Sequence, residues 1–227
     1  MTTNDNTDAT SQPRILVGSD DFSKLLLKSD VFVDKSLLVK DIIEDSGDVI
    51  LITRPRRWGK SLNMDMVHKF LEIEVDNNGA VLPLEQRVNR KLFTGGEVDL
   101  GFGENKILRP LKIAHNKNAM VKQGQFPVIQ LNFKEVKGNS YQEIEAGIRY
   151  QVISLFAQYQ YLNSYVEQNI LLLDDAQKEQ MQRYFTGQID KQDLKSSLRI
   201  LNELLFKHFG QKAYILIDEY DTPINSS

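Results

Sequence analysis

The chain has 227 residues, a formal net charge of −3 at pH 7, 41% hydrophobic residues, 26% charged residues and no cysteine. Its length fits one substantial domain, or one domain with an appendage, and its composition is ordinary for a globular protein. The lack of cysteine excludes disulfides, thiolate metal sites and cysteine nucleophiles, and the charge gives no electrostatic reason for bulk binding to nucleic acid or anionic membranes.

The N-terminus is polar and lacks the basic and apolar regions of a signal peptide, so residues 1–13 are predicted to be a disordered leader. No apolar run approaches the roughly 20 residues that a membrane span needs. We therefore expect a cytoplasmic protein without membrane contact.

Two short helices are expected at Phe22–Leu27 and Ser36–Ile43, and Asp34 is placed to cap the second one or to favour its N-terminal dipole. A turn then leads into Val49–Thr53, whose unbroken apolar run predicts a strand buried on both faces.

The next eight residues, RPRRWGKS, resemble a Walker A loop, which is written G-x-x-x-x-G-K-[ST]. Gly59, Lys60 and Ser61 match its last three positions, whereas Arg54 occupies the position of the first glycine. Apolar residues recur every four positions from Leu62 onward, which predicts an amphipathic helix that starts near Gly59. The order strand, loop and helix favours a phosphate-binding loop, and the alternative is a basic turn that only caps the helix.

In such a loop the backbone amides and the helix N-terminus bind phosphate oxygens. Lys60 would reach the β- and γ-phosphates, and the Ser61 hydroxyl would ligate Mg²⁺. The loop arginines add positive charge near the anion, although a solvated basic loop that binds nucleotide poorly is the alternative. Trp58 could stack on a nucleobase, but packing against neighbouring structure is favoured. The predicted nucleotide-binding residues are Arg54, Pro55, Arg56, Arg57, Trp58, Gly59, Lys60, Ser61 and Leu62.

Residues 76–125 are predicted to form an irregular connection with short elements, followed by a strand at Pro127–Phe133 and a long helix that begins near Ile144. A further helix opens at Asp190 and closes at Gly210. A third strand, Ala213–Ile217, then follows, and this alternation of strands and helices predicts a parallel α/β sheet.

Two acidic residues follow the third strand directly. Asp218 would orient the Mg²⁺ shell, as the acid of a Walker B strand does. Glu219 is the candidate general base that polarises the attacking water, so Glu219 and Lys60 are the predicted catalytic residues. Asp221 is more typical of a turn residue than of a second metal ligand.

The run from Val31 to Met66, together with Arg90–Val98, Phe126–Phe133 and Ala213–Asn225, resembles the AAA-ATPase-like family of bacterial and archaeal P-loop proteins. In that family the phosphate loop usually reads RPRRFGKS, so Arg54 matches the family although it departs from the general Walker A pattern. The resemblance implies a P-loop NTPase-type parallel sheet flanked by helices over residues 14–227, with ATP and Mg²⁺ as cofactors.

Many members of that family continue into more ATPase core and a restriction-endonuclease-like nuclease domain. The resemblance therefore implies that this P-loop domain is incomplete at its C-terminus, because the chain stops just after the Walker B residues.

Two functions remain as hypotheses. One is an ATP-binding protein that hydrolyses ATP only if missing elements are supplied, by a protein partner or by a downstream-encoded remainder of the ATPase. The other is a truncated, non-catalytic remnant or protein-interaction module. Nucleic-acid binding through the loop arginines ranks last, because the chain is acidic overall.

Overall fold

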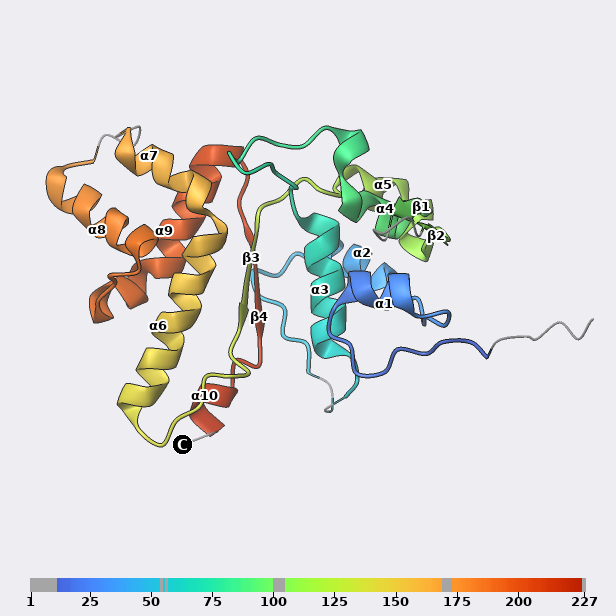
Figure 1. Ribbon diagram of the computed structural model, residues 1–227, viewed down its shortest axis with the longest axis horizontal. Coiled ribbons are helices and arrows are strands. Elements are labelled where there is room, and N and C mark those ends of the chain that lie inside the picture. The colour runs from blue at the N-terminus through green and yellow to red at the C-terminus, as the bar shows by residue number, and fades with distance from the viewer. Residues whose placement is uncertain (1–11, 54, 56, 100–104, 169–172, 226–227) are drawn as a thin grey trace, which may run out of the picture.

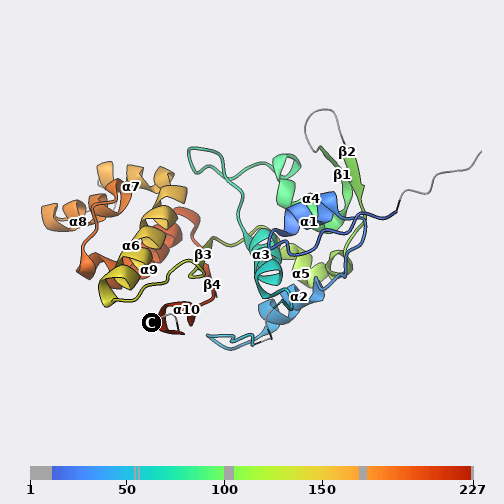
Figure 2. The ribbon, with the colours of Figure 1, turned by 60° about the horizontal axis from the view of Figure 1, so that its bottom comes forward.

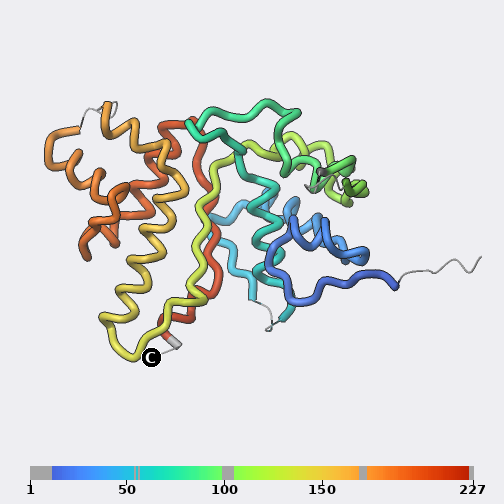
Figure 3. Tube along the Cα trace, in the orientation of Figure 1, coloured from blue at the N-terminus to red at the C-terminus, as the bar shows by residue number. Residues whose placement is uncertain are grey.

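Two parallel strands run side by side through the middle of the molecule, between two groups of helices (Figures 1 and 3). The computed structural model describes residues 12–53, 55, 57–99, 105–168 and 173–225. The strands are β3 (Val128–Asn132) and β4 (Tyr214–Asp218), and their register places Asn132 opposite Asp218. The second and third predicted strands and their parallel pairing are thus confirmed.

Three predicted helices form on one side of this strand pair, and they are α1 (Phe22–Lys28), α2 (Leu37–Glu44) and α3 (Lys60–Leu71). Helix α3 packs against β4 and against α1 (Figure 1). The expectation that Asp34 caps α2 is wrong, because Ser36 is the N-cap and Asp34 accepts from the amides of Ser36 and Lys112, at 2.8 and 2.7 Å. Asp34 thus ties the turn before α2 to the backbone of Lys112, 78 residues along the chain. The alternative, a favourable interaction with the helix dipole, stays a prediction.

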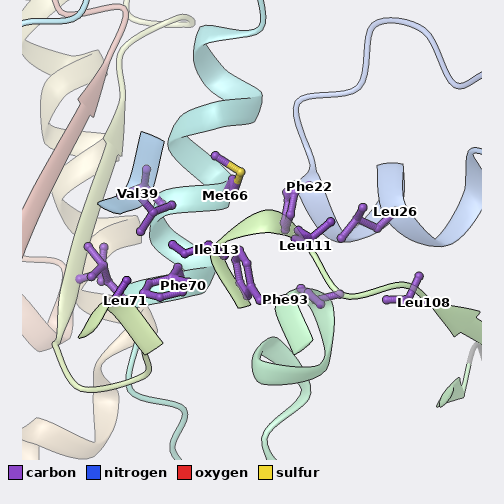
Figure 4. Close-up of a cluster of buried hydrophobic side chains, with 14 of the residues drawn as sticks. Phe22, Leu26, Val39, Met66, Phe70, Leu71, Phe93, Leu108, Leu111 and Ile113 are labelled. Atoms are coloured by element: carbon purple, nitrogen blue, oxygen red, sulfur yellow. The ribbon is translucent and has the colours of Figure 1, made fainter. Parts of the chain in front are cut away.

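Aromatic rings fill the centre of the first hydrophobic core, which lies between α1, α3 and α4 (Figure 4). Phe22 stacks on Phe93 with ring centroids 5.4 Å apart, and Phe70 meets the same ring edge-on at 5.0 Å. Burial of such side chains contributes about 1.5–3 kcal/mol each. This core therefore fixes the position of α3, the helix that follows the predicted phosphate loop.

The connection at 76–125 does contain short elements, as predicted, but the sequence did not show which of them are helices and which are strands. They are η1 (Leu84–Gln86), α4 (Val88–Thr94), β1 (Gly96–Asp99), β2 (Asn105–Leu108), η2 (Lys112–His115) and α5 (Lys117–Val121). The strands β1 and β2 pair antiparallel as a hairpin, which Figure 2 shows beside α4.

The other face of the strand pair is covered by helices from the second half of the chain (Figure 2). They are α6 (Tyr141–Gln158), η3 (Gln160–Leu162), α7 (Asn163–Glu167), α8 (Asp175–Thr186) and α9 (Lys191–Phe209), and the short α10 (Thr222–Asn225) follows β4. The predicted ends of α9 are confirmed, because Asp190 caps its start and Gly210 is the left-handed residue at its end. A second core lies here, built on Ile129, Leu131 and the inner faces of α6 and α9.

The prediction of a buried first strand at Val49–Thr53 is wrong. The segment has no strand assignment, and the side chains of Val49 and Leu51 are 88% and 65% exposed. An apolar run becomes a buried strand only where a neighbouring strand satisfies its backbone and helices cover its faces. In the described part of the chain β4 pairs only with β3, so α/β is the class observed and a P-loop NTPase-type sheet is not.

Part of the predicted leader, residues 1–11, lies outside the described residues, as do Arg54 and Arg56. None of the described helices combines the length and the apolar composition that a membrane crossing requires.

Candidate functional site

The start of α3 has the backbone geometry that an anion site requires. Gly59 precedes the helix in the left-handed conformation, with φ 75° and ψ 29°, which glycine adopts without steric cost. The first helical hydrogen bond runs from the Asn63 amide to the Gly59 carbonyl at 2.9 Å. The amides of Lys60, Ser61 and Leu62 precede this bond, so they have no partner within the helix. Together with the helix dipole they favour a negatively charged group here.

Four further predicted loop residues fall in the described structure. Pro55, Arg57 and Trp58 are exposed, and the Trp58 side chain is 62% exposed, so the expectation that it packs against its surroundings is wrong. Leu62 packs against the first core, which leaves only its backbone amide for a ligand. Arg57 has a positive φ of 67°, a conformation that costs a non-glycine residue about 1–2 kcal/mol.

The predicted acids lie at the carboxyl end of β4. Asp218 is its last residue and is 5% exposed, while its backbone carbonyl accepts from the Phe133 amide at 3.0 Å. One carboxylate oxygen, Oδ1, accepts from the Glu219 amide at 3.0 Å. Glu219 is half-buried and has a φ of 52°, which makes it the second non-glycine residue with a positive φ in the described structure. Such strain is frequent at functional sites.

Asn132 was not among the residues predicted from the sequence. This residue ends β3 directly opposite Asp218, and its side-chain Oδ1 accepts from the Lys134 amide at 2.9 Å. A polar residue at the C-terminal end of a predicted strand was the available signal, because the carboxyl ends of neighbouring parallel strands meet at one sheet edge.

The two halves of the predicted site lie at the same end of the molecule. Helix α3 starts at the lower end in Figure 1, where β3 and β4 finish, and it packs along β4. No described hydrogen bond or ion pair joins Lys60 or Ser61 to Asp218 or Glu219. The fold therefore places the basic helix start and the acidic strand end at the same end of the molecule (Figure 1), with no described bond between them.

A different polar cluster ties the far end of α3 to β3. The Nε2 atom of His68 lies 3.3 Å from the Glu72 carboxylate, and its Nδ1 contacts the side chain of Gln130. Burial lowers the pKa of His68, but Glu72 and Gln130 raise it more, so the net pKa lies above the usual value. This cluster anchors the helix and lies away from the predicted phosphate loop.

A family profile described as "Predicted AAA-ATPase" matches residues 16–82 and 101–227. The chain belongs to this family. The matched residues of this AAA-ATPase-like chain include the loop at the start of α3 and both acids after β4, but not residues 83–100. Neither a curated protein nor a solved structure matches the chain.

The residues at this end of the fold fit ATP and Mg²⁺ by their chemistry. Ser61 and Asp218 offer the hard oxygen donors that Mg²⁺ prefers, and Mg²⁺ is usually held by one or two protein groups together with phosphate oxygens and water. Within the described ranges no three His, Asp or Glu side chains gather as a metal site. A cation here would therefore depend on phosphate for part of its coordination.

Proposed function

We propose that the chain is an ATP-binding protein, with the phosphates at the start of α3. Lys60 contributes a positive charge to the β- and γ-phosphates, and the free amides of Lys60, Ser61 and Leu62 contribute donors. Gly59 allows the backbone to approach the phosphates closely. Of the loop arginines, Arg57 is exposed and free to pair with phosphate oxygens.

Ser61 and Asp218 would hold Mg²⁺, which when bound neutralises charge on the phosphates. Asp218 accepts the Glu219 amide at Oδ1, and its carboxylate keeps further acceptor sites for the cation or its water shell. Glu219 would act as the base that takes a proton from the attacking water. Hydrolysis additionally needs groups that stabilise the transition state, and we propose turnover only where a partner supplies them.

One observation carries this proposal. Helix α3 begins with a left-handed glycine, a lysine and a serine at the same end of the molecule where β4 delivers Asp218 and Glu219 (Figure 1). Ligands of α/β proteins bind at the carboxyl ends of parallel strands and at helix N-termini, and both features coincide here.

Calorimetric titration with Mg-ATP tests the proposal. Replacing Lys60 by Ala removes charge-assisted hydrogen bonds worth about 1.5–3 kcal/mol, so the affinity should fall by about 10- to 100-fold. Lys69→Ala is the matched control, because Lys69 lies in the last turn of the same helix, away from the loop. Glu219→Gln should bind Mg-ATP like the unmodified chain and lower any hydrolysis. Equal affinity of the unmodified chain and Lys60→Ala would refute the proposal.

A specific observation favours the second candidate, a protein-interaction module. Apolar side chains of Val49 and Leu51 are exposed beside the loop, and Ile215 and Ile217 of β4 are 44% and 38% exposed. Large apolar side chains left exposed on the surface are a feature of protein-binding surfaces. No heat of Mg-ATP binding from a folded chain would favour this candidate over nucleotide binding.

A further inference from the structure

A shallow basic depression is lined by residues of η1 and α4. Helix α4 lies away from the start of α3 (Figure 1). Its volume is about 350 Å³. It is lined by Leu84, Glu85, Arg87, Arg90, Lys91 and Thr94. All six residues fall within residues 83–100, the stretch that the family profile leaves unmatched, and the proposed nucleotide site uses none of them.

The depression has three cationic side chains, Arg87, Arg90 and Lys91, and hydrogen bonds hold the two arginines in place. The Nε of Arg87 donates to the Leu82 carbonyl at 2.8 Å, and Nη1 of Arg90 donates to Oε1 of Gln123 at 3.3 Å. Gln123 is 2% exposed, and its amide nitrogen has no partner among the described residues. Each guanidinium has five N–H donors, so both arginines keep donors for a ligand. Holding them before binding lowers the entropy cost of recognition.

The cations of this depression have no close ion-pair partner, although the Glu74 carboxylate interacts with Arg87 at longer range. No ion pair within 4 Å involves Arg87, Arg90 or Lys91 in the described structure. Glu85 is the single acidic residue in the lining. The nearby Glu74 is committed to the start of α4, where it accepts from the amides of Val88 and Asn89 at 2.9 and 3.1 Å. The lining thus carries three cations and one carboxylate, with the Glu74 carboxylate beside it, in a chain that is acidic overall.

The chemistry of this lining favours phosphate. Guanidinium forks match phosphate oxygens in pairs, and a dianion can engage Arg87, Arg90 and Lys91 from several sides, whereas one fork satisfies a carboxylate. The volume is near the lower end of the range for small-molecule sites, roughly 300–1,000 Å³. The net charge of −3 disfavours a nucleic-acid strand, whose backbone needs an extended basic surface.

We propose that this depression on η1 and α4 is a second anion site that binds a small phosphate-bearing ligand independently of the loop at the start of α3. The observation that supports it is the pair of protein-held arginines, joined by Lys91, around one concave surface without an ion-pair partner.

Equilibrium dialysis with labelled inorganic phosphate tests this proposal on the full chain carrying Lys60→Ala, which removes the lysine of the other phosphate site. We expect saturable binding that Arg90→Gln and Lys91→Gln each weaken by about tenfold, the loss of one charge-assisted hydrogen bond. Lys91 is exposed, so its replacement should leave the fold intact, and circular dichroism checks this. Lys137→Gln is the matched control, since Lys137 is an exposed lysine outside the depression.

Three outcomes would overturn the proposal. They are the lack of saturable binding at millimolar phosphate, equal affinities of Lys91→Gln and Lys137→Gln, and tighter binding of a single-stranded oligonucleotide than of phosphate in the same background. The last outcome would identify a nucleic-acid surface instead of a small-ligand site. Because Lys60 is absent from every sample, failure here leaves the ATP titration unaffected.

Discussion

Replacing Asp193 should lower the free energy of unfolding more than replacing an exposed aspartate does. Asp193 lies in the first turn of α9 and is fully buried. Its carboxylate accepts two hydrogen bonds from Arg183, at 2.9 and 3.0 Å, one from Gln180 at 3.1 Å and one from the Asp190 amide at 3.0 Å. It therefore closes the capping box of α9 and joins α9 to α8.

The magnitude follows from these contacts. Losing the capping interaction costs about 1 kcal/mol. Losing the paired hydrogen bonds to Arg183 costs about 2 kcal/mol, less than for a fully buried pair because the Arg183 side chain is 30% exposed. Asp193→Ala should thus lower the free energy of unfolding by about 3 kcal/mol, and Asp193→Asn, which keeps an acceptor, by about half as much.

Urea denaturation followed by circular dichroism measures this difference, with Asp20→Ala as the control because Asp20 is exposed. Burial would raise the pKa of Asp193, but its hydrogen bonds from Arg183, the Asp190 amide and Gln180 lower it below the usual value. Its stabilisation is therefore present above about pH 4 and is lost as the pH falls through the folded-state pKa. A cost for Asp193→Ala within about 0.5 kcal/mol of the control would refute the reasoning.

Substitutions at three other positions test the helix start, the strand end and the cluster of His68, Glu72 and Gln130. Gly59→Ala should lower the free energy of unfolding by about 1 kcal/mol, measured in urea, because alanine at φ 75° is strained. Glu219→Gly should raise it by about 1 kcal/mol by relieving the strain at φ 52°, whereas Glu219→Ala should not, and equal values would contradict this. For His68, whose pKa is raised, the stabilisation is complete below about pH 6.5 and is lost as the pH rises through the folded-state pKa, so His68→Gln should cost more at low pH than at high pH in the same assay.

The helices with strong local signals were predictable from the sequence. Helix α9 combines an aspartate cap, regular leucine spacing and a closing glycine, and the structure has all three. Helix α8 was missed because its exposed, polar residues hide the helical period, although its capping box at Asp174 and Gln177 was a readable signal.

For the candidate site, the sequence predicted which residues start the helix and end the strand, but not the segments that surround them. The Gly59–Ser61 segment starts a helix as expected, and Asp218 ends a strand as expected. The strand predicted at Val49–Thr53 does not form, because strand formation depends on pairing with a neighbouring strand. The apolar sequence is the same whether or not such a neighbour is present. The prediction that Trp58 packs against its surroundings is wrong for a related reason. A large aromatic side chain is buried only where neighbouring elements cover it.

The pairing of β3 with β4 sets a condition on how the chain acquires its structure. All of α6 to α9 separates these two strands along the sequence, so their contact closes a long loop. Pairing of this kind slows folding, because chain entropy is lost before distant contacts form. During synthesis β3 emerges well before β4, and its apolar Ile129 and Leu131 must wait without the neighbouring strand. Until β4 is synthesised, we therefore expect β3 to be a segment of the nascent chain that is prone to aggregate.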